Sequence, residues 1–98
     1  MFVFLTKIKE DAKKVSYKFE TNISSAVYKN PVGHKRDFAE VVYGFCTFDK
    51  ETQECHLDNG TDPYFIKINP EREAVFEKLR EIAQSGQNFP EELSLHRE

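Results

Sequence analysis

The sequence predicts an α+β domain in which an antiparallel sheet of four to five strands carries one C-terminal helix on one face. Two observations predict it. Segments in which apolar and polar residues alternate fill the first half of the chain and are separated by short polar turns, and one later stretch has apolar residues at helical spacing. At 98 residues, we expect a single compact domain over residues 1–98 with a mobile last few residues.

The first two predicted strands cover residues 2–9 and 15–23 and form a hairpin. A turn at residues 11–14 pairs Glu10 with Val15, and the same register sets three more pairs: Ile8 opposite Tyr17, Thr6 opposite Phe19, and Phe4 opposite Thr21. The apolar residues of both strands then share one face. The other face and the turn carry a compact basic surface made of Lys7, Lys9, Lys13, Lys14 and Lys18.

Residues 24–37 show no clear pattern, and the loop-like composition of residues 30–36 predicts no regular element there. A second hairpin follows, with strands at residues 38–48 and 53–58. Its turn places residue 48 opposite 53, 47 opposite 54, and 46 opposite 55. The better core face of this hairpin is the one that holds Val42, Gly44, Cys46, Phe48, Gln53, Cys55 and Leu57.

The last predicted elements are a short fifth strand at residues 64–68 and the helix. Asn69 suits the N-cap, Pro70 suits the first helical position, and the acidic residues that follow suit the helix dipole. An apolar stripe and a terminating glycine complete the helix: Val75, Phe76, Leu79, Ile82, Ala83 and Gly86. Beyond it, Phe89 and Leu93 are expected to fix the tail to the body.

Composition and charge describe a soluble globule, with 39% hydrophobic and 32% charged residues and a formal net charge of −3. That small charge conceals an asymmetry, because residues 1–36 carry a net +5 and residues 37–98 carry −8. The first apolar run, residues 1–5, is too short for the core of a signal peptide. We therefore expect a cytoplasmic protein with reduced thiols and no membrane association.

The sequence contains no familiar catalytic, phosphate-binding or zinc-binding spacing, so we expect no enzymatic activity, no cofactor and no metal. His56 follows Cys55 directly and therefore points to the opposite face of its strand. Cys46 and Cys55 face each other in the predicted register, at a separation that permits a cross-strand disulfide. The alternative is that both are reduced thiols packed in the core.

The second face of the second hairpin predicts a partner-binding site. It combines apolar and aromatic residues with a polar rim: Val41, Tyr43, Phe45, Glu54, His56 and Asp58. The alternatives are that this strand is covered on both sides, or that Gly44 marks a bulge that shifts the register.

We therefore predict a small non-catalytic protein-binding domain, most concretely an acidic inhibitor of the immunity or antitoxin type that occupies a basic toxin or nuclease. The alternative is a nucleic-acid-binding accessory protein that uses the five lysines of the first hairpin. Against it, the aromatic residues of that hairpin are predicted to face away from the lysines. A third possibility is a homo-oligomer in which the basic hairpin of one copy meets the acidic half of another.

Overall fold

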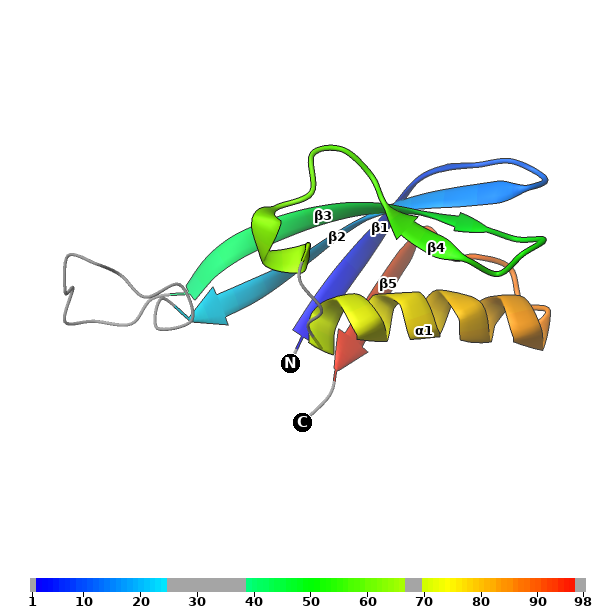
Figure 1. Ribbon diagram of the computed structural model, residues 1–98. Helices are drawn as coiled ribbons and strands as arrows, with labels where there is room; N and C mark the ends of the chain where they lie inside the picture. Colours follow the sequence, from blue (N-terminus) through cyan, green and yellow to red (C-terminus); the bar gives the residue numbers. More distant parts are fainter. Residues whose placement is uncertain (1, 25–38, 67–69, 97–98) are drawn as a thin grey trace, which may run out of the picture.

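The structure, a computed structural model, describes residues 2–24, 39–66 and 70–96. It is an α+β fold in which a five-stranded antiparallel sheet, in the order β4-β3-β2-β1-β5, is covered on one face by a single helix (Figure 1). The predicted fold class is therefore confirmed. The elements are β1 (Phe2–Glu10), β2 (Lys14–Ser24), β3 (Ala39–Asp49), β4 (Cys55–Leu57), the 3-10 helix η1 (Pro63–Phe65), α1 (Pro70–Ser85) and β5 (Glu92–His96).

The first hairpin forms with Glu10 opposite Val15 as predicted, but a β-bulge between Lys7 and Lys9 changes the rest of its register. The predicted partners of Ile8, Thr6 and Phe4 are therefore wrong. The bulge adds one residue to β1, so the two sides of the strand exchange places before it. The observed pairs are Lys7 with Tyr17, Thr6 with Lys18, Leu5 with Phe19, Phe4 with Glu20, and Val3 with Thr21.

The exchange decides which apolar residues of β1 enter the core. Val3 and Leu5 are fully buried, whereas Phe2 and Ile8 remain 39% and 54% exposed. Lys7 moves to the helix-covered side, where its Nζ donates to the carbonyl oxygen of Phe89 at 2.9 Å.

The second hairpin is also out of its predicted register, by two residues: Phe48 faces Cys55, Thr47 faces His56, and Cys46 faces Leu57. Its turn is wider than predicted. The Asp49 carboxylate accepts hydrogen bonds from the amides of Glu51 and Thr52, and Gln53 adopts a positive φ of 60°. Because side chains alternate with a period of two, a shift of two residues leaves every side chain on its predicted face.

The prediction of a fifth strand at residues 64–68 is wrong for the residues of that segment that the structure describes. Residues 63–65 form η1, because the Asp62 side chain accepts a hydrogen bond from the amide of Tyr64 at 2.9 Å and Pro63 suits the start of a helix. Ile66 caps the end of η1, and residues 67–69, which include the last two residues of that segment and the predicted N-cap Asn69, lie outside the described residues. The fifth strand is instead β5, which pairs with β1 at the opposite edge of the sheet.

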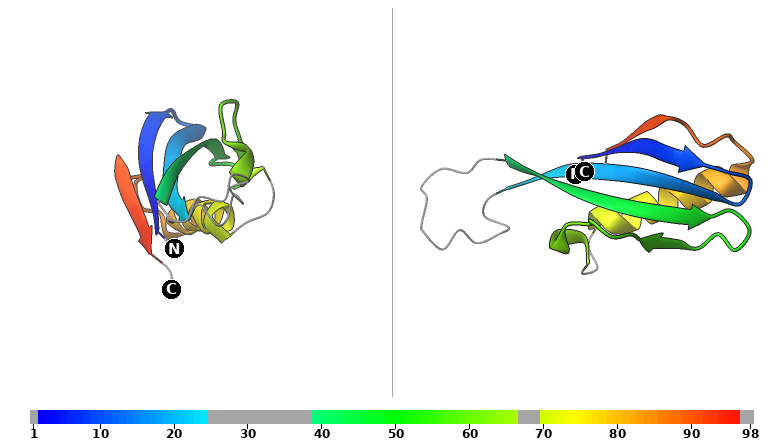
Figure 2. Two further views of the ribbon diagram at one scale, coloured as in Figure 1. Left: turned by 90° about the vertical axis from the view of Figure 1, so that its left-hand side faces the viewer. Right: turned by 90° about the horizontal axis from the view of Figure 1, so that it is seen from above.

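The helix α1 lies across one face of the sheet and encloses the core (Figure 2). Its predicted stripe is confirmed: Val75, Leu79 and Ile82 are buried, and the chain leaves the helix through Gly86 at a φ of 74°. Phe89 is buried and Leu93 is half-buried, so the tail is held as predicted. The largest fully buried side chains between sheet and helix are Tyr17, Phe19, Phe48, Phe65, Leu5 and Leu79.

Candidate functional site

The face of the sheet that α1 leaves uncovered, called here the open face, carries the candidate site. On the right of Figure 2 the strands lie in front of α1, so this face is toward the viewer. Cross-strand pairing sets its residues in rows: Phe4 pairs with Glu20, which pairs with Tyr43, and Thr6 pairs with Lys18, which pairs with Phe45.

The apolar and aromatic members of the predicted partner-binding site occupy this face. Val41 is 45% exposed and Tyr43 is 42% exposed, and the half-buried Phe45 follows them on β3. Gly60 explains why Phe45 is less accessible: a Cβ at Gly60 would lie 3.3 Å from the Phe45 ring, and the φ of 92° favours glycine there. The turn at residues 58–62 thus covers one edge of this ring.

That turn is fixed to β3 by hydrogen bonds. The amide of Asp58 donates to the carbonyl oxygen of Phe45 at 2.7 Å, and the amide of Asp62 donates to that of Tyr43 at 2.8 Å. The hydroxyl oxygen of Thr61 accepts from the Phe45 amide at 3.0 Å. Tyr43 and Phe45 therefore stand on a part of β3 that is hydrogen-bonded along both edges.

The polar members of the predicted site lie in two places. His56 and Asp58 lie on the open face beside Thr47, whereas Glu54 lies in the turn that leads into β4. Thr47 Oγ1 donates to Asp58 Oδ2 at 2.6 Å, Ser16 Oγ lies 2.9 Å from Thr47 Oγ1, and His56 Nε2 lies 3.3 Å from Asp58 Oδ1. In this network His56 and Thr47 both contact the carboxylate of Asp58.

The predicted basic surface is divided. Lys9, Lys14 and Lys18 are on the open face, but Lys7 is on the helix-covered side and Lys13 is in the turn. The Lys18 ammonium lies 4.5 Å from the centroid of the Tyr43 ring.

Tyr17 and Phe19 are fully buried and face away from Lys9, Lys14 and Lys18, as predicted, but Tyr17 pairs with Lys7 on the helix-covered side. Yet Phe2, Phe4, Tyr43 and Phe45 share the lysine face. The predicted separation of aromatic and basic residues therefore does not hold for the sheet as a whole.

Lys7 and Glu10 belong to a charged cluster at the turn end of the first hairpin. Glu10 accepts from Lys50 and from Lys7, each at 2.7 Å, and these two hydrogen bonds lower the pKa of its carboxyl. The hydrogen bond to Glu10 is in turn the main cause of the raised pKa of Lys7.

The two cysteines are free thiols on the helix-covered side, away from the open face. The predicted pairing of Cys46 with Cys55 is wrong, because the hairpin register is shifted. The two cysteines are instead diagonal neighbours on β3 and β4. The hydrogen bond with Cys55, followed by burial, raises the pKa of the Cys46 thiol. A disulfide between them stays a prediction.

Three hollows open on this side of the sheet. Two of about 270 and 410 Å³ lie near the turn end and share Lys9, Ser16 and Thr47 as lining residues. A third, of about 270 Å³, lies among Phe2, Phe4 and Val41. Sequence reasoning missed Phe2 and Phe4 as surface residues, because the neighbouring positions 3 and 5 are equally apolar and alternation alone did not separate the two sides. It missed Ile8 because no local signal marks the bulge at that position.

Among the residues that the structure describes, no three His, Cys, Asp or Glu side chains are grouped so that they could hold a metal ion. No helix within residues 2–24, 39–66 and 70–96 is long and apolar enough to cross a membrane. No protein-family model, curated protein or solved structure matches the chain.

Proposed function

We propose that this protein is a non-catalytic binding domain whose open face receives another protein. The observation that carries the proposal is the exposure of Val41 and Tyr43 beside Phe45 on a strand paired along both edges. Aromatic and aliphatic side chains held rigidly within a polar surround are typical of the centre of a protein interface. Little conformational entropy is lost when such a surface binds, because its strands are already ordered.

The charges on the open face favour a partner of mixed polarity. Lys9, Lys14 and Lys18 are balanced there by Glu20, Asp58 and Glu92, so neither sign dominates. An acidic inhibitor of a basic toxin or nuclease is a finer version of this proposal. It would use the exposed acids of α1, such as Glu73 and Glu81, and leave the open face for another contact.

The test is binding of proteins from the native host to the full chain and to matched variants. Val41→Glu and Tyr43→Glu place a charge at the centre of the open face and should weaken binding of a captured, then purified, partner by at least about tenfold. Arg80→Glu, on the exposed side of α1, is the control and should bind normally. Equal binding by all three variants would exclude the open face, and loss only with Glu81→Lys would favour the inhibitor version.

A second copy of the chain is the other protein that could cover this face. Sedimentation over a wide concentration range separates the two cases. If the chain forms a dimer that Tyr43→Glu dissociates and Arg80→Glu leaves intact, the open face binds a second copy of the chain and not a different protein.

Nucleic-acid binding is a second candidate because the ammonium of Lys18 lies over the ring of Tyr43 on a face that also carries Phe2 and Phe4. Bases stack on such rings while lysines contact phosphates. An oligothymidylate titration at several salt concentrations tests it. Affinity that falls steeply with salt and with Tyr43→Ala would support this candidate, and no binding at low salt would exclude it.

A further inference from the structure

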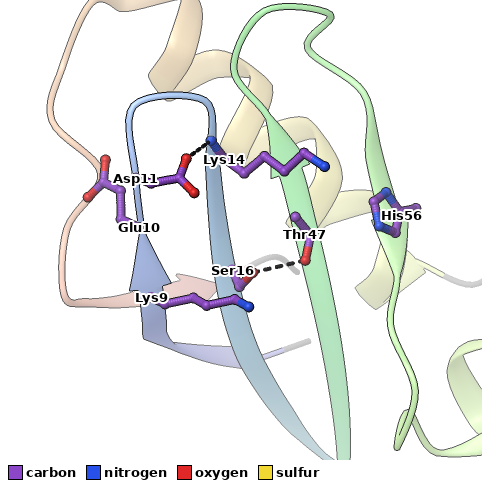
Figure 3. A pocket seen from close by; sticks show the side chains of 7 residues that line it. All are labelled: Lys9, Glu10, Asp11, Lys14, Ser16, Thr47 and His56. Carbon is purple, nitrogen blue, oxygen red and sulfur yellow. Dashed lines mark hydrogen bonds between the residues drawn. The ribbon is translucent and has the colours of Figure 1, made fainter.

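The turn end of the open face holds a hollow of about 270 Å³ in which unpaired cations meet a polar floor. Figure 3 shows the side chain of Lys9 extending from β1 across β2 and that of Lys14 extending from the start of β2 toward β3, with His56 on the far side. Between them, the hydroxyls of Ser16 and Thr47 form the floor, 2.9 Å apart. The hollow therefore brings two ammonium groups, from β1 and β2, and the imidazole of His56 from β4 to one place.

The carboxylates around this hollow already accept hydrogen bonds from other groups of the chain. Glu10 is held by Lys7 and Lys50, and its side chain points away from the floor (Figure 3). The Asp11 carboxylate accepts from the amides of Lys13 and Lys14 at 2.7 and 2.8 Å, and these bonds lower its pKa.

On the far side of the hollow, Asp58 is occupied in the same way, because Thr47 donates to it and His56 lies beside it. Lys9 and Lys14, in contrast, form no ion pair with any residue that the structure describes. Lys14 interacts electrostatically with Asp11 and Asp49 without an ion-pair contact, so both ammonium groups keep their hydrogen-bond donors for an external anion.

An apolar extension adjoins this cationic hollow. The neighbouring space of about 410 Å³ shares Lys9, Ser16 and Thr47 and adds Ile8 and Phe45. Ile8 is on the bulge of β1 and is 54% exposed, so it presents an aliphatic wall. A ligand that fills both spaces must carry a compact anion joined to a flat or apolar group.

We propose that the two hollows form a binding site for a phosphate ester, with the phosphate between Lys9 and Lys14 and the esterified group against Ile8 and Phe45. A phosphate carries close to two negative charges at neutral pH and matches two ammonium groups. The site deepens the proposed function and rests on it in one respect: a phosphorylated side chain of the protein that covers the open face is the source of the ester.

A single phosphate suits this face better than a polyanion does. Beyond the hollow, Glu20 and Glu92 alternate with Lys18 along the sheet, and the chain as a whole has a formal charge of −3. A nucleic acid would bring further phosphates against those carboxylates. A protein segment with one phosphorylated residue and apolar neighbours would avoid that repulsion.

The test is a backbone-amide NMR titration of the full chain with phenyl phosphate, inorganic phosphate and phosphoserine. We expect phenyl phosphate to shift the amides around residues 8–16, 45–47 and 56–59, and to bind more tightly than the two probes without a ring. Lys9→Gln and Lys14→Gln should each weaken it at least about fivefold. Lys13→Gln is the matched control, because Lys13 is an exposed neighbour that does not line either hollow.

Ile8→Ser tests the apolar part of the site without risk to the core, since Ile8 is exposed. It should remove the advantage of phenyl phosphate over inorganic phosphate and leave inorganic phosphate unchanged. If phenyl phosphate shifts the amides of Lys9→Gln and Lys14→Gln as much as those of Lys13→Gln, the site is overturned. Tighter binding of oligothymidylate, with shifts along the whole open face, would overturn it in favour of a nucleic-acid surface.

The titration needs no partner protein, so its failure is distinct from failure of the proposed function. Phenyl phosphate binding in a chain whose open face captures no protein would retain the site and overturn its assignment to a protein partner. If Tyr43→Glu abolishes partner binding and Lys9→Gln leaves it unchanged, the proposed function is retained. The assignment of a phosphorylated residue to the partner is then overturned.

Discussion

The aromatic ring of Phe19 on β2 lies directly against the backbone of Gly44 on β3. The two residues are cross-strand partners, and a Cβ at position 44 would fall 2.5 Å from Cε2 and 2.9 Å from Cε1 of the ring, and closer still to Cζ. The same ring packs edge-on against Phe65 at a centroid distance of 4.7 Å. The glycine is therefore required by packing, and β3 has no bulge there.

Gly44→Ala should destabilise the fold by overpacking. The new methyl group must displace a buried ring that Phe65 holds from another side, and such overpacking typically costs about 1–3 kcal/mol. Urea unfolding followed by circular dichroism measures the loss. The double variant Phe19→Leu with Gly44→Ala is the control, because the smaller side chain should make the two effects less than additive. A Gly44→Ala variant with the native unfolding midpoint would show that the ring is free to move.

Tyr17 should make the protein sensitive to alkali. Its ring is fully buried and its hydroxyl donates to the carbonyl oxygen of Pro90; burial, followed by the charges of Glu10 and Glu91, raises its pKa. The neutral phenol stabilises the fold fully below the unfolded pKa of about 10, and this contribution is lost as the pH rises toward the higher folded value.

Tyr17→Phe should therefore cost about 0.5–1.5 kcal/mol at pH 7 and reduce the loss of stability above pH 10. Urea unfolding at a series of pH values between 7 and 11 measures both effects. A variant that loses stability above pH 10 as steeply as the native chain would contradict the assignment to Tyr17.

Glu10 should contribute to stability at neutral pH and cease to do so in acid. Hydrogen bonds from Lys50 and Lys7 lower its pKa, so the contribution is present above the unfolded pKa near 4.5 and is lost as the pH falls through the folded value. Glu10→Gln should be less stable by up to about 1 kcal/mol at pH 7, with the difference shrinking below pH 4.

Thermal unfolding at pH 7 and pH 3 tests this expectation. Glu51→Gln is the control, because the exposed Glu51 side chain forms no ion pair in the described structure and its removal should change little at either pH. A difference between Glu10→Gln and the native chain that is equally large at pH 3 would mean that packing, not charge, accounts for it.

The two thiols should differ in reactivity. Cys46 is fully buried and its pKa is raised by the hydrogen bond with Cys55, whereas Cys55 is half-buried. Because the thiolate is the reactive form, iodoacetamide should modify Cys55 at least about tenfold faster than Cys46, as measured by peptide mass mapping. Equal rates would indicate that the helix-covered side opens readily. Loss of both alkylation sites after mild oxidation would support the predicted disulfide.

Local signals in the sequence were sufficient for α1 and for the faces of β3. The helix has a proline start, an apolar stripe and a glycine end that all agree. The faces of β3 were predicted correctly although the hairpin register was not, because an error of two residues keeps each side chain on its side. The placement of Val41, Tyr43 and Phe45 on the open face was therefore predicted correctly, and their role in binding stays a prediction.

The bulge in β1 and the position of β5 could not be predicted in the same way. Positions 2 to 5 are all apolar, so alternation does not tell which pair enters the core, and that choice depends on packing against Phe19 and α1. β5 has an alternating pattern in Leu93 and Leu95, but only five residues carry it. Its partner is more than 80 residues away in the sequence, and no local signal identifies it.

The pairing of β5 with β1 also places a demand on protein synthesis. The ribosome emits Phe2–Thr6 more than 80 residues before Glu92–His96, yet these segments are neighbours in the finished sheet. Until the late segment emerges, the early strand has a row of amide and carbonyl groups that any other extended chain could pair with. A nascent or truncated chain that ends before Glu92 would therefore be prone to aggregate, even though it contains every residue of the helix and of the hairpin core.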